Sequence, residues 1–242
     1  MNERRAIVTG GSTGIGVAIV NALLERGYEV SALSRRPSPV KHARLTSVQV
    51  DLADPATTRA TAAELAARAP ATTIVHNAGA ILEKPLEEVQ AVDIDTLAHL
   101  HLTAALELVQ ANLQAMRAAH FGRIVLISSR AVLGLARRTA YAATQAGMLG
   151  LARTWSLELA PSGITVNVVA PGPIEETEMF ESVVEKGSPR RAALAQSIPV
   201  RRLGLPADIA RAVLFFTDPE AGFVTGQTLY VCGGASVGSL AL

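Results

Sequence analysis

Short apolar runs alternate with longer stretches that carry helix signals along almost the whole chain. The apolar runs are rich in Val, Ile and Leu and are bounded by turn residues, as buried strands are. Strands are expected at Ala6–Thr9, Glu29–Leu33, Thr46–Val50, Thr73–His76, Arg123–Ser128, Thr165–Ala170 and Thr228–Val231. Helices are expected at Gly14–Arg26, Pro55–Arg68, within Ile94–Ala119, and at Tyr141–Leu159 and Pro206–Thr217. This alternation predicts the α/β class, with a doubly wound, mostly parallel seven-stranded sheet and helices on both faces.

One segment, from Pro171 to Pro199, interrupts the alternation. It follows a strand and is rich in Glu, Ser, Pro and Gly, so we expect a mobile flap over a site, inserted at about 171–200. No internal repeat or low-complexity linker divides the chain. A single domain over residues 1–242 is therefore expected.

Composition narrows the possible partners. Hydrophobic residues make up 49% of the chain and charged residues only 18%, a balance that favours contacts between subunits. The net charge of +1 gives no reason to expect nucleic acid or an anionic membrane as a partner. The lone Cys232 rules out an internal disulfide, and no apolar run is long enough to span a membrane. The expected location is the cytoplasm.

A glycine cluster follows the first predicted strand. It reads Thr9-Gly10-Gly11-Ser12-Thr13-Gly14-Ile15-Gly16, and a helix is expected to begin inside it. The free N–H groups and the positive dipole end of that helix would face a pyrophosphate, which the glycines allow to approach closely. The cluster therefore predicts a dinucleotide site.

Two more motifs complete the pattern. Ile127-Ser128-Ser129 closes a buried strand, and Tyr141-Ala142-Ala143-Thr144-Gln145 places a tyrosine and a glutamine on one helix face. Together with the glycine cluster they resemble the short-chain dehydrogenase/reductase family, most closely its beta-ketoacyl carrier-protein reductase-like members. The resemblance covers about Arg5 to Gly234. It implies a single NAD(P)-binding domain with a Rossmann fold and a homo-oligomer, tetramer or dimer.

The end of the second predicted strand indicates which nicotinamide cofactor binds. NAD-specific relatives carry an acidic residue there, whereas this chain has Ser34, Arg35 and Arg36. A carboxylate would repel a 2′-phosphate, but a hydroxyl and a guanidinium would bind it. NADP(H) is therefore the expected cofactor.

The resemblance implies three further cofactor contacts. The segment after the third strand would contact the adenine, and a glycine after the fourth strand would let the backbone approach the cofactor closely. The start of the flap would contact the nicotinamide. His76, at the end of the fourth strand, is expected to have a core role. The implied cofactor-binding residues are Gly10, Ser12, Thr13, Gly14, Ile15, Gly16, Ser34, Arg35, Arg36, Asp51, Leu52, Asn77, Ala78, Gly79, Tyr141, Gln145, Pro171, Gly172, Ile174 and Thr177.

The resemblance also assigns the chemistry. Tyr141 would donate a proton to a carbonyl, and Ser129 would hydrogen-bond the same oxygen. The family has a lysine where this chain has Gln145, and an asparagine where it has His101. Gln145 can still bond a ribose but carries no charge. Alcohol oxidation, which needs the phenolate, should suffer more from this change than carbonyl reduction, which uses the neutral phenol.

Two interpretations of His101 remain open. It either passes protons in place of the missing lysine, as a histidine can near neutral pH, or it is a packed helix residue. The nearby His99 shows that this helix tolerates histidine.

The sequence therefore predicts an NADPH-dependent reductase of a small-molecule carbonyl compound, such as a ketone or a 3-oxoacyl thioester, with no metal. Two alternatives stay open. One is a cofactor-binding subunit with little or no turnover, and the other is an atypical member that uses His101 as an acid or base for other chemistry.

Overall fold

The strands form one sheet in the computed structural model, which describes residues 4–237. Their spatial order is β3-β2-β1-β4-β5-β6-β7, and all neighbours pair in parallel. The strands are β1 (Arg5–Thr9), β2 (Glu29–Ser34), β3 (Leu45–Gln49), β4 (Thr73–His76), β5 (Gly122–Ile127), β6 (Ile164–Pro171) and β7 (Thr228–Val231). Every residue of β4, β5 and β6 is buried, as expected for parallel strands covered on both faces.

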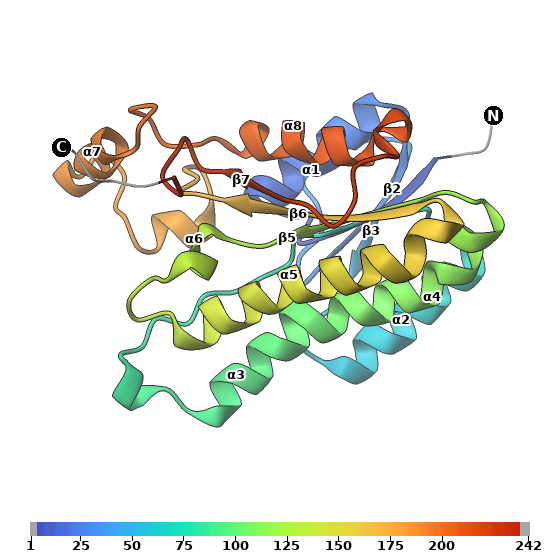
Figure 1. Ribbon diagram of the computed structural model, residues 1–242, viewed down its shortest axis with the longest axis horizontal. Coiled ribbons are helices and arrows are strands. Elements are labelled where there is room, and N and C mark those ends of the chain that lie inside the picture. Colours follow the sequence, from blue (N-terminus) through green and yellow to red (C-terminus); the bar gives the residue numbers. More distant parts are fainter. Residues whose placement is uncertain (1–3, 238–242) are drawn as a thin grey trace.

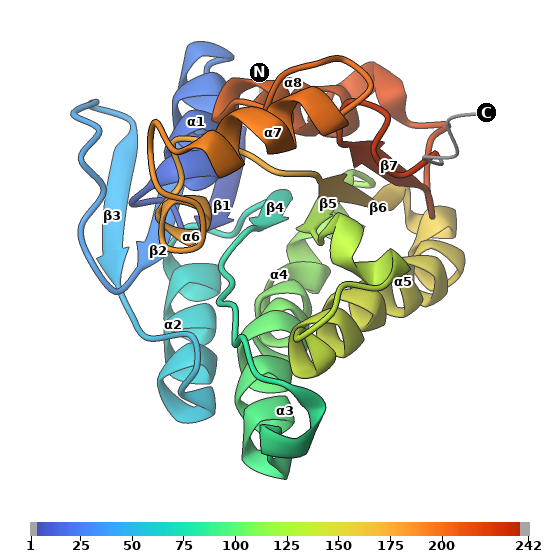
Figure 2. The ribbon, with the colours of Figure 1, turned by 90° about the vertical axis from the view of Figure 1, so that its left-hand side faces the viewer.

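Helices cover both faces of the sheet (Figure 2). α2 (Pro55–Arg68), α4 (Ala104–Ala118) and α5 (Thr139–Leu159) pack on one face, where Leu108, Met148 and Trp155 belong to the core. α1 (Gly14–Glu25) and α8 (Pro206–Thr217) pack on the other. The remaining short 3₁₀ segments are Leu86–Glu88, Arg130–Leu133, Ala160–Ser162 and Pro219–Ala221.

The helix expected within Ile94–Ala119 has an unexpected internal irregularity. It consists of α3 (Ala91–Ala98), a π-helical turn over His99–Thr103, and then α4. A π turn widens the helix locally and often occurs at functional sites. Here the turn contains His101, whose side chain is fully buried. Sequence periodicity does not reveal such a turn.

The segment after β6 contains two short helices, α6 (Glu178–Glu181) and α7 (Pro189–Ser197). They lie beyond the carboxyl end of β6, at the edge of the sheet where α1 begins (Figures 1 and 2). The flap therefore has secondary structure of its own, which the sequence interpretation did not include. The predicted seven-stranded doubly wound fold is confirmed.

Within residues 4–237, no helix is long and apolar enough to cross a membrane.

Candidate active site

A cavity of about 810 Å³ opens at the carboxyl ends of the strands, where β1 and β4 lie side by side. In doubly wound sheets this is the place where the strand order reverses and ligands bind. Every residue predicted for the site lines this cavity except His101. The structure therefore brings together segments that are far apart in the sequence, from the glycine cluster to the flap.

The glycine cluster forms a tight turn between β1 and α1. Gly10 and Gly14 have positive φ angles of 68° and 48°, which favour glycine. A Cβ on Gly16 would lie 1.9 Å from the Gly10 carbonyl oxygen, so no larger residue fits there without movement. Thr13, the N-cap of α1, makes no side-chain hydrogen bond to the first turn, which also holds no acidic residue. The start of α1 thus presents backbone N–H groups and glycine surface to the cavity.

Thr9 ties the ends of β1 and β4 together. Its hydroxyl oxygen accepts hydrogen bonds from the backbone N–H of Asn77 at 2.9 Å and of Ala78 at 2.8 Å. It also lies 3.1 Å from Nδ1 of His76, whose Nε2 is 3.1 Å from the Leu100 carbonyl oxygen. Burial lowers the pKa of His76 to about 4, so this histidine is neutral and structural. Thr9 was not among the predicted site residues, although it opens the glycine motif.

The end of β2 carries two arginines with different environments. Ser34 donates a hydrogen bond to the Arg36 carbonyl oxygen at 2.7 Å, which fixes the turn. Arg36 makes a two-pronged ion pair with Glu178 of α6, at 2.8 and 2.7 Å. Within the described chain, the Arg35 side chain has no hydrogen bond or ion pair. Arg35 is therefore the more available of the two cations.

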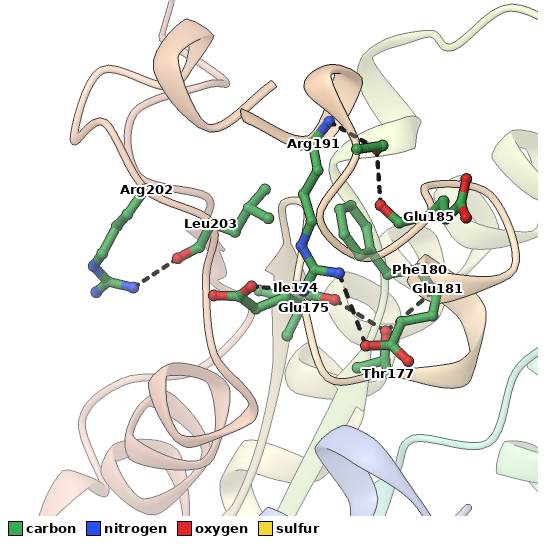
Figure 3. Close-up of polar contacts among 10 residues, drawn as sticks. Ile174, Glu175, Thr177, Phe180, Glu181, Glu185, Arg191, Arg202 and Leu203 are labelled. Carbon is green, nitrogen blue, oxygen red and sulfur yellow. Dashed lines mark hydrogen bonds and ion pairs between the residues drawn. The ribbon is translucent and has the colours of Figure 1, made fainter. Parts of the chain in front are cut away.

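Polar contacts between its own residues hold the flap together (Figure 3). Arg191 of α7 binds Glu175 at 2.7 Å and lies 3.9 Å from a carboxylate oxygen of Glu181. Thr177 donates a hydrogen bond to the Ile174 carbonyl oxygen at 3.0 Å and accepts one from the Phe180 N–H at 3.2 Å. The Thr177 hydroxyl, predicted to contact the nicotinamide, is thus already used to cap α6.

Thr177 also lies close to the glycine turn. A Cβ on Gly14 would be 3.0 Å from its methyl carbon. Apolar flap residues line the cavity beside it, a contribution that sequence reasoning missed because α6 is too short to show periodicity. These residues are Met179, Phe180, Val183, Val184 and Leu194.

Tyr141, Ser129 and Gln145 line the other end of the cavity. Tyr141 is 6% exposed, and burial raises the pKa of its phenol, an effect partly offset by the Ser129 hydroxyl and the charge of Arg138. Ser129 accepts a hydrogen bond from the Ala131 N–H at 3.1 Å. The predicted pair of hydroxyls therefore shares one cavity wall.

Gln145 is buried at 3% exposure, yet its Oε1 has no hydrogen-bond partner in the described chain. The neighbouring Ser128 donates to the Gln145 backbone carbonyl at 3.0 Å, which secures this turn of α5. A buried amide oxygen without a partner costs about 1–3 kcal/mol, and Gln145 faces the cavity. An acceptor is thus available for a ligand hydroxyl.

His101 lies behind Gly79, outside the cavity. Its Nε2 accepts a hydrogen bond from the Ala80 N–H at 3.2 Å, so Nδ1 carries the proton and donates it to the Thr144 hydroxyl at 2.8 Å. Burial, followed by His76, lowers the pKa of His101 to about 3. The ring also packs edge-on against Tyr141, with centroids 5.8 Å apart. These contacts favour the packing interpretation over the proton relay.

Known proteins are similar to this chain in sequence and in fold. Residues 10–236 match the family described as "Enoyl-(Acyl carrier protein) reductase". The chain is 33% identical to the 3-oxoacyl-[acyl-carrier-protein] reductase MabA of Mycobacterium tuberculosis, over 98% of this chain and 94% of MabA.

Two solved structures are similar throughout. One, described as an NAD(P)-dependent gluconate 5-dehydrogenase from Beutenbergia cavernae with bound NADP at low occupancy, is 32% identical, with a TM-score of 0.88 and 97% coverage of both chains. The other, a blue fluorescent protein from a metagenomic library in complex with NADPH, is also 32% identical, with a TM-score of 0.83 and coverage of 96% and 98%. The chain belongs to the short-chain dehydrogenase/reductase family of oxidoreductases.

Proposed function

We propose that this protein reduces a carbonyl group of a small molecule with NADPH, with Tyr141 as the proton donor. The observation that carries the proposal is a single cavity that joins the glycine turn of α1 to the hydroxyls of Tyr141 and Ser129. A nucleotide cradle and a proton donor are the two parts that carbonyl reduction requires.

The residues present fit an NADP nucleotide. The glycine turn and the uncapped start of α1 suit a pyrophosphate, and Arg35 with Arg36 suits a 2′-phosphate. The unpartnered Oε1 of Gln145 suits a ribose hydroxyl. When bound, this cofactor supplies the hydride. Two similar proteins of known structure contain NADP or NADPH, which supports the same choice here.

The raised pKa of Tyr141 suits reduction. Burial keeps the phenol protonated at neutral pH, so the acid is ready to donate as negative charge develops on the carbonyl oxygen. The Ser129 hydroxyl bonds the same oxygen and orients it. The raised pKa also makes the phenolate scarce, so we expect alcohol oxidation to be the slower direction.

A 3-oxoacyl thioester or a related ketone is the substrate class that we propose. The similar protein MabA is named as a reductase of 3-oxoacyl groups on acyl carrier protein. In this chain, apolar side chains of Leu82, Leu135, Met179 and Leu194 line the cavity, and they would pack against an acyl chain.

We also propose a homo-oligomer. Leu157 on α5, Phe215 on α8 and Phe223 before β7 are large apolar side chains exposed on the surface of the chain. Such residues commonly become buried between subunits.

A direct test is to follow NADPH oxidation by the purified protein with a panel of ketones and 3-oxoacyl thioesters, alongside Tyr141→Phe. We expect turnover by the unmodified protein and nearly none by the variant. Tight NADPH binding without turnover of any carbonyl compound would instead support the cofactor-binding subunit.

A further inference from the structure

A buried arginine stands beside the proposed proton donor. Arg138 is the N-cap residue of α5 and precedes Tyr141 by three positions, and both residues line the cavity. Its side chain is only 7% exposed, and its Nε is buried without a hydrogen-bond partner in the described chain. A guanidinium buried this deeply is rare unless it is paired.

The arginine is held in place from two sides. Its Nη2 donates to a carboxylate oxygen of Glu83 at 2.6 Å, and its Nη1 donates to the Arg137 carbonyl oxygen at 3.2 Å. Arg137 itself binds the other oxygen of Glu83 at 3.2 Å. Two arginines thus share one carboxylate, so this cluster carries a net charge of about +1 beside the cavity.

Two side chains close to Tyr141, those of His101 and Gln145, carry no positive charge. His101, packed edge-on against the Tyr141 ring, is neutral, and Gln145 on the same helix is an amide. Asp93 on α3, the helix packed against α5, is paired with Lys84 at 2.7 Å. Arg130, which follows Ser129, also lines the cavity, but its charge does not contribute to the pKa shift of the phenol. Within the described chain, the Arg138 guanidinium is therefore the cation best placed to act on the phenol.

We propose that Arg138 supplies the fixed positive charge that stabilises the Tyr141 phenolate, a task that Gln145 cannot perform. Arg138 acts through Tyr141 and not on the substrate, and this role rests on the proposed function of Tyr141. The charge of Arg138 already offsets part of the effect of burial on the phenol's pKa. The positive charge thus comes from Arg138, just before α5 begins, rather than from position 145, one helical turn after Tyr141.

The test reads Tyr141 directly, without cofactor or substrate. Position 141 is occupied by difluorotyrosine, a phenol that ionises closer to neutral pH, and fluorine NMR follows its titration in the full-length protein. In Arg138→Gln we expect the midpoint to rise by about one pH unit, the low end for loss of a nearby opposite charge because Glu83 already neutralises part of it. Arg138→Lys should stay within about half a unit of the parent protein.

Arg137→Gln is the matched control. It removes the same charge from the same cluster, but its side chain is 54% exposed, so its effect on the midpoint should be smaller. Equal shifts in Arg137→Gln and Arg138→Gln, or no shift in Arg138→Gln, would overturn the proposal.

Glu83→Gln should shift the titration midpoint in the opposite direction. It also replaces Arg138→Gln as the test if that variant does not fold. It leaves both arginines without their carboxylate, so the midpoint should fall; a midpoint that stays or rises contradicts the proposal. Because the titration requires no turnover, a protein that reduces no ketone can still pass it. Conversely, ketone reduction with an unmoved midpoint would remove only the role of Arg138.

Discussion

The two ends of the cavity are built in different ways. At the nucleotide end, shape comes from the backbone: the turn from Gly10 to Gly16 leaves no room for a Cβ at Gly16. At the proposed catalytic end, shape and charge come from the side chains of Tyr141, Gln145 and Arg138. Backbone recognition requires specific glycines and therefore stays visible in a sequence. A charge can be supplied from any neighbouring segment, so the catalytic end can change its residues and keep its task.

Removal of the proposed proton donor should have the largest effect at the catalytic end. If Tyr141 is the acid, Tyr141→Phe should lower turnover roughly 10²–10⁴-fold while NADPH binding at the other end is unchanged. Steady-state kinetics and a fluorescence titration of NADPH check the two halves separately. A variant that reduces ketones at the parent rate would remove Tyr141 from the mechanism.

Removing Arg35, which has no side-chain ion pair among residues 4–237, tests the nucleotide end. Arg35→Ala should weaken NADPH binding by about 1.5–3 kcal/mol, the range for a hydrogen bond to a charged group, and leave NADH binding unchanged. Arg36→Ala is the control, and its effect should be smaller because Arg36 is already paired with Glu178. Equal affinity of the unmodified protein for both cofactors would refute the assignment.

A substitution of His101 can distinguish a packing role of this residue from a role in proton transfer. Its pKa is about 3 in the folded protein and near 6.5 in the unfolded chain, so its contribution to stability is complete above pH 6.5 and is lost as the pH falls. At pH 5 that loss is roughly 2 kcal/mol.

His101→Asn should therefore lose less stability than the parent between pH 7 and pH 5, by about this amount, in urea unfolding. The pH–rate profile of reduction should keep its shape in the same variant. A changed profile together with an unchanged stability difference would restore the proton relay.

A lysine at position 145 should change the rate of alcohol oxidation relative to that of ketone reduction. Gln145→Lys adds a cation to α5 and should lower the pKa of Tyr141 by about one unit, which raises alcohol oxidation about tenfold relative to ketone reduction near neutral pH. The ratio of the two initial rates is the measurement. An unchanged ratio would mean that position 145 does not act on the phenol.

The smallest effect is expected where the flap meets the nucleotide end. Glu178→Gln breaks an exposed ion pair and frees Arg36 for a 2′-phosphate. Since such pairs contribute about 0–1 kcal/mol, NADPH should bind at most about fivefold more tightly. Calorimetry with NADPH and NADH compares the two; tighter binding of both alike would point to the flap rather than the phosphate.

The fold was largely predictable because apolar runs and glycines report directly on strands and turns. The predicted ends of some elements differ from the observed ones by one or two residues: Ser128 lies just after β5, and α5 begins at Thr139. The π turn at His99–Thr103 could not be predicted, because it depends on packing against α5 and β4 rather than on local propensity.

The residues lining the site were also largely predictable, but their bonding was not. Thr177 lies where expected, yet its hydroxyl caps α6. Arg138 has no motif to mark it, since its importance depends on Glu83, which is distant in sequence. His101 was assigned to the site by family resemblance alone, and a fold is needed to show that Gly79 separates it from the cavity.

The π turn has a consequence for how this chain can evolve. Each residue of an α-helix advances the axis by about 1.5 Å and turns it by about 100°, so a deletion within a regular helix rotates everything beyond it. A π turn already contains one residue more than an α turn needs in the same length. Loss of one residue between His99 and Thr103 would therefore leave α3 and α4 in register with the sheet, and would mainly discard the inward position that His101 now occupies. We therefore expect this helix to tolerate the loss of one residue without a change of fold.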